Sequence, residues 1–280
     1  MNICRQLVRK YDYETFLSCL FLPQNIQKVA FAIKALNVET ARIKESSKSE
    51  TLQQQRMEFW LSSIEKLNEQ KNFQNPILDA LAECKIVNPS WLQVMINARK
   101  VDLLKKGYFT IADIEDYSEK VLASQFYLLM EQDGIESANS FQAASHLAKS
   151  ITINIFMRGS RELARNQKIN WPIRSMAKFK VTDEMFYEYS LDSSLHKDKI
   201  CHLVAEVAEF SQSHLSACQS LLKGLNGREK KHFMQIIPTQ DYLTTLERKK
   251  FQLHEADLSL DSRLLLKMWW KGYEKLENYK

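Results

Sequence analysis

The chain has 280 residues, of which 45% are hydrophobic, and 39 Lys and Arg against 34 Asp and Glu give it a formal net charge of +5. The hydrophobic content supports a folded core and excludes disorder throughout. No run approaches the ~18–20 apolar residues that a membrane span requires, which predicts a soluble chain or one on a membrane surface. The mildly basic charge selects no anionic partner, and no nucleic-acid partner is expected.

Six glycines and five prolines are few for this length. A β-rich protein needs many tight turns built from these residues, so their scarcity predicts long helices. The five cysteines are odd in number, widely spaced and without a C-x-x-C pair, which argues against a zinc site or a disulfide framework and fits a reducing compartment. They are Cys4, Cys19, Cys84, Cys201 and Cys218.

Residues 1–10 carry three cations and no acid, so a short targeting sequence and an ordinary basic N-terminus both remain open. Apolar residues then recur at three- and four-residue spacing, which predicts helices over about 26–44 and 53–67. Asn75-Pro76 and Asn88-Pro89 indicate two further helix starts.

Thr110 and Asp113 have capping-box spacing and predict a helix that runs to Gly134. A longer helix is predicted over 141–164, where small residues at its start permit close backbone approach, and a loop follows over 165–172. The remaining predicted helices are 183–189, 198–222, 240–253 and 260–279. No repeat or linker interrupts them, so residues 11–280 are expected to form a single all-helical domain.

The segment 11–45 begins YDYETFLSCLFLP and continues as a helical run. It resembles the opening of the squalene/phytoene synthase family, and weaker motif similarity extends over nearly the whole chain. The resemblance implies an all-α, isoprenoid-synthase-like helical bundle.

Active members of that family carry two acidic boxes that hold Mg²⁺ against a diphosphate. The first, D-D-x-x-D, falls here on Ala-Arg-Ile-Lys-Glu, residues 41–45. The second, D-x-x-x-D after a Leu-Arg pair, falls on Gly159 to Leu163, after Met157-Arg158. Mg²⁺ contacts carboxylates and substrate phosphates, so the resemblance implies loss of the metal site and of prenyl transfer; no metal or cofactor is expected.

The same resemblance places a remnant cavity, either open or filled by side chains, at the former active site. Its expected lining comprises Arg42, Lys44, Glu45, Tyr117, Arg158 and Glu162.

Two segments resemble a mitochondrial branch of the family that serves respiratory complex I. They are Arg-Lys-Tyr-Asp-Tyr-Glu at residues 9–14 and Asn-Val-Glu at residues 37–39, which stands in place of the first acidic residues. The resemblance implies a pseudo-enzyme that assists assembly through contacts with complex I subunits or other assembly factors, as a peripheral protein on the matrix side of the inner membrane. Two alternatives remain: a Mg²⁺-dependent synthase using Glu39, Glu45 and Glu162, and a peripheral lipid-binding protein.

Other polar groups have structural interpretations. Asp113 and Asp116 are expected to favour the positive end of a helix dipole, and His146 to be packed. His202 and His214 lack the H-E-x-x-H arrangement of a zinc enzyme. Near the C-terminus, Trp269 and Trp270 belong to a basic helix that either closes the core or lies at a membrane interface. Adjacent tryptophans cannot share one helix face, so this pair is a candidate membrane or partner surface.

Overall fold

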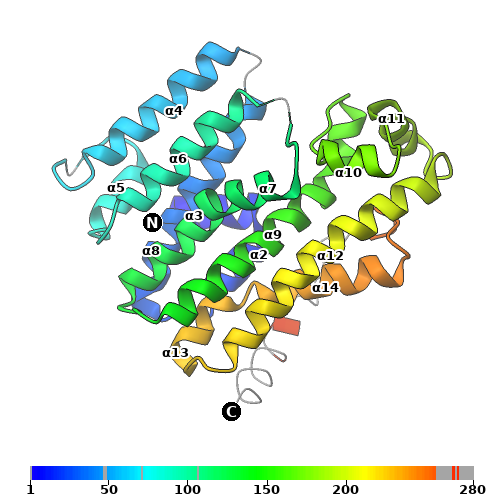
Figure 1. Cartoon of the computed structure of the whole chain (residues 1–280). Coiled ribbons are helices and arrows are strands. Elements are labelled where there is room, and N and C mark those ends of the chain that lie inside the picture. The colour runs from blue at the N-terminus through cyan, green and yellow to red at the C-terminus, as the bar shows by residue number, and fades with distance from the viewer. Residues whose placement is uncertain are drawn as a thin grey trace. The chain divides into compact units, whose positions relative to one another are not determined.

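The computed structural model describes residues 2–46, 49–70, 72–105, 107–256, 267, 268 and 270. All regular structure in these ranges is helical, which confirms the predicted all-α class (Figure 1). Contacts divide the chain into two compact units, which we describe separately. Unit 1 comprises residues 1–104, 119–144 and 221–235, and unit 2 comprises residues 105–118, 145–220 and 236–280.

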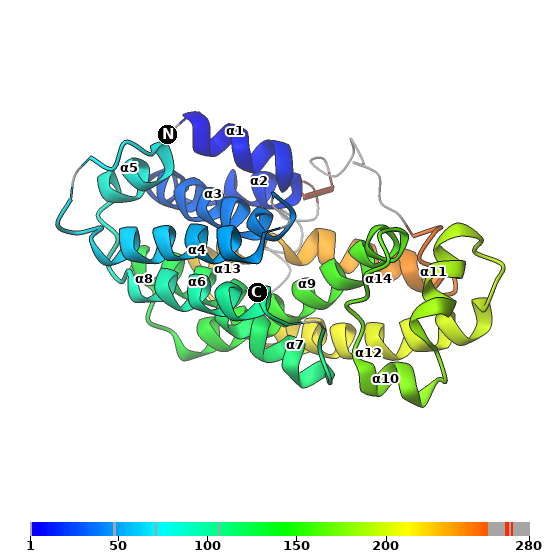
Figure 2. The ribbon, with the colours of Figure 1, turned by 90° about the horizontal axis from the view of Figure 1, so that it is seen from above.

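Unit 1 is built around the 23-residue helix α3, which contacts α1, α2, α4, α5, α6 and α8. Figure 2 shows α1 lying along α3. The elements of unit 1 are α1 (Asn2–Tyr11), α2 (Tyr13–Cys19), α3 (Gln24–Ser46), α4 (Glu50–Glu65), α5 (Pro76–Glu83), α6 (Ser90–Leu103), η1 (Glu119–Ala123), α8 (Ser124–Gln132), α13 (Gly227–Lys230) and η2 (Lys231–Phe233). The predicted helix over 26–44 therefore corresponds to α3, and the helix predicted over 53–67 to α4.

Helix starts follow the predicted signals. The Asn75 side-chain oxygen accepts hydrogen bonds from the backbone N–H groups of Ile77 and Leu78 at 3.0 and 3.3 Å, and Pro76 occupies the first position of α5. A side chain that accepts from the first unpaired amides stabilises a helix by about 1 kcal/mol. The Asn-Pro pair therefore starts α5 as predicted.

The single helix predicted from Thr110 to Gly134 is interrupted. It consists of α7 (Ile111–Ser118), a π-helical turn, η1, and α8. Within and after the wide turn, the Ser124 hydroxyl donates to the Lys120 carbonyl at 2.8 Å, and the Gln125 amide donates to the Val121 carbonyl at 2.7 Å. These side-chain bonds supply partners where the regular backbone ladder is displaced.

Unit 2 holds α7 together with α10 (Ile173–Lys178), α11 (Asp183–Leu191), α14 (Ile236–Arg248) and most of α9 (Ala138–Arg165) and α12 (Lys197–Leu222). The Ser211 hydroxyl of α12 lies 3.1 Å from the Ser150 carbonyl oxygen of α9. A serine side chain reaches a neighbouring helix's backbone only where the helices approach closely, as the small residues of α9 predicted. The Asn154 amide donates to the Thr239 carbonyl at 3.3 Å and links α9 to α14.

The predicted C-terminal helix lies mostly outside the described residues, and Trp269 is among those not described. Lys267 forms an ion pair with Asp241 of α14 at 2.9 Å, Met268 is fully buried, and Trp270 is 62% exposed. No helix in the described ranges is both long and apolar enough to cross a membrane.

Candidate functional site

The six residues predicted to line the remnant cavity fall into two groups. Arg42, Lys44 and Glu45 lie on the last turns of α3 in unit 1, whereas the other three residues belong to unit 2. The second group comprises Tyr117 of α7 and Arg158 and Glu162 of α9. We describe the contacts of each group within its own unit.

In unit 1, the two cations of this group connect α3 to its neighbours. The Arg42 guanidinium lies 3.9 Å from the centre of the Tyr11 ring and 3.7 Å from a Glu39 carboxylate oxygen. The Lys44 ammonium lies 3.3 Å from the Asp102 carboxylate at the end of α6. Glu45 is exposed. Each cation is thus already partnered by a residue of unit 1.

In unit 2, Tyr117 belongs to an aromatic cluster, its ring centroid 5.9 Å from that of Tyr108 and 6.2 Å from that of Phe156. Arg158 lies two residues after Phe156 on α9, and its guanidinium is 5.6 Å from the centre of the Tyr242 ring. Glu162, one turn later, is 74% exposed and lies 3.9 Å from Arg165. Arg158 and Glu162 line one pocket with residues of α14 and the segment after it.

A polar network that the sequence analysis missed runs through unit 1. The Lys34 ammonium donates to the Gln125 side-chain oxygen at 3.0 Å, and the Gln125 amide donates to the Asn37 oxygen at 2.9 Å. Arg99 also donates to that Asn37 oxygen at 2.6 Å. The available signal was a single lysine within Ala30 to Leu36, a stretch that is apolar on every face of the helix.

Lys34 is 4% exposed, and burial lowers its pKa from the ordinary value of 10.5, partly offset by nearby Cys19 and Asp12. The unfolded chain keeps the proton up to about pH 10.5, so it binds more protons than the folded chain between the two pKa values. The free energy of unfolding therefore rises with pH in that window, by up to about 1.4 kcal/mol per unit.

We expect Lys34→Met to remove this rise. Urea denaturation from about pH 7 to about pH 10 gives the free energy of unfolding of wild type and variant. The difference between the two values should grow with pH. The matched control is Lys28→Met on the exposed side of α3, which should leave the slope unchanged. A constant difference between wild type and Lys34→Met would contradict the assignment.

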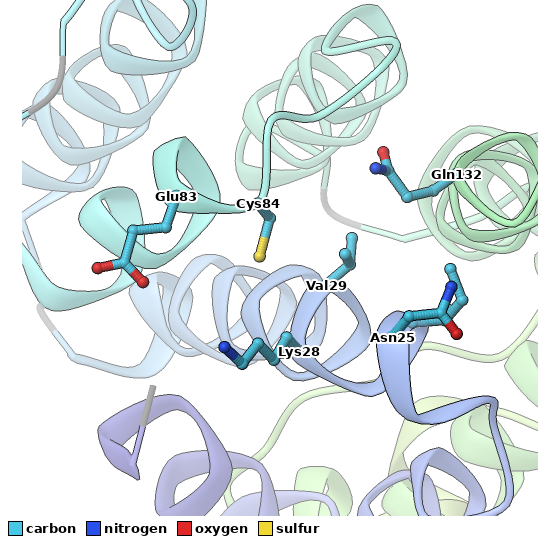
Figure 3. Close-up of a pocket in the computed structure, with 7 residues that line it drawn as sticks. Asn25, Lys28, Val29, Glu83, Cys84 and Gln132 are labelled. Carbon is cyan, nitrogen blue, oxygen red and sulfur yellow. The ribbon is translucent and has the colours of Figure 1, made fainter.

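A second pocket, in unit 1, has a volume of about 210 Å³. It lies between the start of α3 and the ends of α5 and α8 (Figure 3). Lys28 and Glu83 contribute opposite charges to its lining, and Cys84 contributes a thiol. Burial, followed by the charge of Glu83, raises the pKa of that thiol. The reactive form of cysteine is the thiolate, so Cys84 is a poor nucleophile at neutral pH.

Three titratable side chains far apart in the sequence meet in unit 2. The Nδ1 atoms of His146 and His214 are 2.9 Å apart, and His214 Nε2 lies 3.0 Å from the Glu115 carboxylate. The three come from α9, α12 and α7, and no local motif predicts their meeting. Although His146, His214 and Glu115 are in contact, no group of three or more His, Cys, Asp or Glu side chains in the described ranges is placed so that it could hold a metal ion.

At the start of α7, the backbone N–H of Thr110 donates to the Asp113 carboxylate, which confirms the predicted capping box. Hydrogen bonds from Thr110 also lower the pKa of Asp113.

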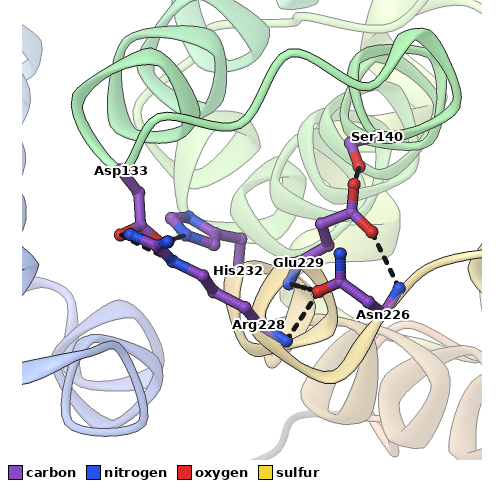
Figure 4. Close-up of polar contacts among 6 residues, drawn as sticks. All are labelled: Asp133, Ser140, Asn226, Arg228, Glu229 and His232. Carbon is purple, nitrogen blue, oxygen red and sulfur yellow. Dashed lines mark hydrogen bonds and ion pairs between the residues drawn. The ribbon is translucent and has the colours of Figure 1, made fainter.

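Figure 4 shows a buried carboxylate in unit 1 between two basic side chains. Asp133, at the end of α8, accepts from Arg228 Nη2 at 2.6 Å and from His232 Nε2 at 2.9 Å. Its side chain has no exposed surface. Burial by itself raises the pKa of Asp133, but the bonds and charges of Arg228 and His232 outweigh it and lower the pKa. Burial lowers the pKa of His232.

Comparison with solved structures defines the class of fold. A dehydrosqualene synthase crystal structure matches with a TM-score of 0.81, covering 99% of this chain and 96% of that one at 15% identity. The fold is the isoprenoid-synthase-like helical bundle that the sequence predicted.

Comparison with sequences defines the family. The squalene/phytoene synthase model matches residues 8–270, and the chain belongs to this family. A Bos taurus protein named NADH dehydrogenase (ubiquinone) complex I, assembly factor 6 is 28% identical over 96% of this chain and 82% of its own length. Its Drosophila melanogaster homolog is 29% identical over the same shares of the two chains.

Proposed function

We propose that this chain is a non-catalytic assembly factor for respiratory complex I that acts through protein contacts on the matrix side of the mitochondrial inner membrane. The observation that carries the proposal is the match to the bovine and fly assembly factors over 96% of the chain. A match of this extent includes both compact units, so the relatives share the whole family domain and not one fragment of it.

The residues at the expected acidic boxes support a non-catalytic role. Ala41 and Arg42 occupy carboxylate positions of the first box, and Gly159 and Leu163 occupy those of the second. One acid remains in each box. Glu162 of the second box lies 3.9 Å from Arg165, and Glu45 of the first box is exposed and stands without a second box carboxylate beside it. Glu39, which precedes the first box, lies 3.7 Å from Arg42. Mg²⁺ bound to a diphosphate needs carboxylates that are free to coordinate it.

Depletion of this protein in its source cells should reduce assembled complex I, measured by native gel electrophoresis and NADH oxidation, and re-expression should restore it. The decisive variant replaces the three acids that a Mg²⁺-dependent synthase would use: Glu39→Gln, Glu45→Gln and Glu162→Gln. All three side chains are at least partly exposed, so the variant should fold and restore complex I as well as wild type.

Two outcomes would contradict the proposal. Normal complex I after depletion would remove the assembly role. Release of diphosphate from a prenyl diphosphate by the purified protein with Mg²⁺, lost in the triple variant, would establish the synthase alternative. Two treatments of mitochondria test the location. Carbonate extraction should release the protein, because it releases peripheral membrane proteins. Added protease should degrade the protein only after the inner membrane is broken, because the protein lies on the matrix side.

A further inference from the structure

The outer side of α1 carries positive charge without any negative charge in the same helix. Arg5, Arg9 and Lys10 are exposed, and α1 contains no acidic residue. Arg5 and Arg9 are four residues apart and therefore share one face of the helix. Lys10 follows the exposed Ile3 by seven residues, or about two helical turns, so these two side chains form a second row. We call Arg5, Arg9 and Lys10 the cationic surface of α1.

The inner side of α1 is occupied by the core of unit 1. Cys4 and Val8, also four residues apart, have no exposed surface. Within unit 1, α1 contacts α2, α3 and α5, and it lies along α3 (Figure 2). The apolar face of this helix therefore enters no other environment while α1 stays packed, and the cationic surface is the part that a partner meets.

Aromatic rings, and not carboxylates, contact the cations of this surface. The Arg5 guanidinium lies 5.3 Å from the centre of the Phe31 ring, and the Lys10 ammonium lies 4.9 Å from the centre of the Tyr11 ring. Among the described residues, none of the three cations forms an ion pair with a carboxylate. An aromatic ring attracts a cation but carries no net charge, so the positive charge of the surface is not neutralised.

Two acids near α1 have other partners within unit 1. Asp12, the first acid along the chain, accepts from the backbone N–H of Thr15 at 3.1 Å and caps α2. Glu39 of α3 lies 3.7 Å from Arg42, whose guanidinium is 3.9 Å from the centre of the Tyr11 ring. Arg42 therefore places a further basic side chain at the end of α1.

We propose that the cationic surface of α1 binds the head groups of a bilayer rich in anionic phospholipid. Lys and Arg side chains are attracted to the negative surface potential of such a bilayer. Ile3 and Tyr11, which are 54% and 42% exposed, lie beside the cations, and apolar or aromatic side chains next to basic ones are typical of surfaces that lie in a membrane interface. The proposal rests on the proposed location at a membrane and names the surface that faces the lipid.

This mode of binding differs from that of an amphipathic helix that inserts its apolar face. Cys4 and Val8 stay in the core of unit 1, so the contact is mainly electrostatic and leaves the fold of the protein unchanged. Electrostatic contact with exposed charges is screened by salt, with a Debye length of about 10 Å at 0.1 M. Binding through α1 should therefore be reversed by salt.

The test is flotation of the purified full chain with vesicles that contain phosphatidylglycerol and with vesicles of phosphatidylcholine alone. Wild type should float only with the anionic vesicles, and it should dissociate as salt rises from about 50 to about 500 mM. The double variant Arg9→Gln, Lys10→Gln should bind about tenfold or more weakly, since each basic side chain near the surface contributes to the attraction. Thermal denaturation checks that the variant is folded.

Three controls separate this surface from net charge and from the C-terminal tryptophans. Arg174→Gln together with Lys199→Gln makes the same change in net charge on exposed positions of unit 2 and should float as wild type does. Arg9→Lys keeps the charge and should also float as wild type does. Trp270→Ser alters the other candidate membrane surface and should leave flotation unchanged.

The proposal is overturned if wild type does not float with anionic vesicles, a result that would leave an acidic protein surface as the partner of α1. It is also overturned if the α1 double variant floats as wild type does, if the unit 2 double variant loses as much binding as the α1 variant, or if Trp270→Ser abolishes flotation. Failure of the proposed function is a separate result. Normal complex I after depletion would remove the assembly role and leave the binding of vesicles in place.

Discussion

Asp133→Ala should lower the free energy of unfolding by about 1–3 kcal/mol, because it leaves the buried Nε2 of His232 without its hydrogen-bond partner, whereas the side chain of Arg228, which is 59% exposed, can be solvated by water. The variant deprives Arg228 of its carboxylate and leaves the side chain of His232, 1% exposed, without the acceptor for its Nε2. Urea denaturation at neutral pH measures the change. The contribution of Asp133 should also be lost as pH falls through its folded-state pKa, which lies below the ordinary value of 3.8.

The control for this experiment is Glu136→Ala. Glu136 is an exposed acid three residues further along the chain, and it should change stability by no more than about 0.5 kcal/mol. Arg228→Ala and the double variant complete a cycle that isolates the coupling between the two side chains. A loss of less than about 1 kcal/mol in Asp133→Ala would show that the cluster contributes little to unit 1.

Deletion of residues 2–11 should lower the free energy of unfolding by about 3–6 kcal/mol. The deletion removes two fully buried apolar side chains, Cys4 and Val8, and burial of one such side chain contributes roughly 1.5–3 kcal/mol. Cys4 and Val8 of α1 have no exposed surface, and the guanidinium of Arg5 lies 5.3 Å from the centre of the Phe31 ring of α3. Thermal and urea denaturation of the purified full-length and shortened chains give the difference.

Ile3→Ser is the matched control, because Ile3 lies on the opposite face of α1 and is 54% exposed. It should change stability by about 0.5 kcal/mol or less. A deletion that leaves stability unchanged would favour the interpretation of residues 1–10 as a removable targeting segment. A large loss would place α1 in the core of unit 1.

The sequence predicted the helices whose signals are local. Asn75-Pro76 marks the start of α5, and the apolar spacing marks α3, because caps and periodicity depend on neighbouring residues. The π turn after Ser118 was missed, since one extra residue in a turn leaves helical propensity unchanged. The short helices α10 and α13 were also missed, because neither is long enough to show an apolar period.

The candidate site was harder to predict than the helices. The family resemblance assigned Arg158 and Glu162 to a remnant cavity, and that assignment stays a prediction; the structure places both residues beside one small pocket of unit 2. It gave no indication of Leu253 or His254, which reach the same part of unit 2 from beyond α14. Lys34, Asn37, Arg99 and Gln125 likewise come from three helices, and a network of that kind has no sequence spacing by which to recognise it.

Unit 1 is discontinuous, and this has a consequence for synthesis on the ribosome. Its last segment, residues 221–235, follows most of unit 2 in the chain, yet Arg228 and His232 partner Asp133, and Gln235 donates to Thr15 across 220 positions. Contacts of such sequence separation form late, because the intervening loop must close first. The N-terminal helices therefore emerge long before their packing can be completed, and until then the nascent chain exposes apolar surface that a chaperone can shield.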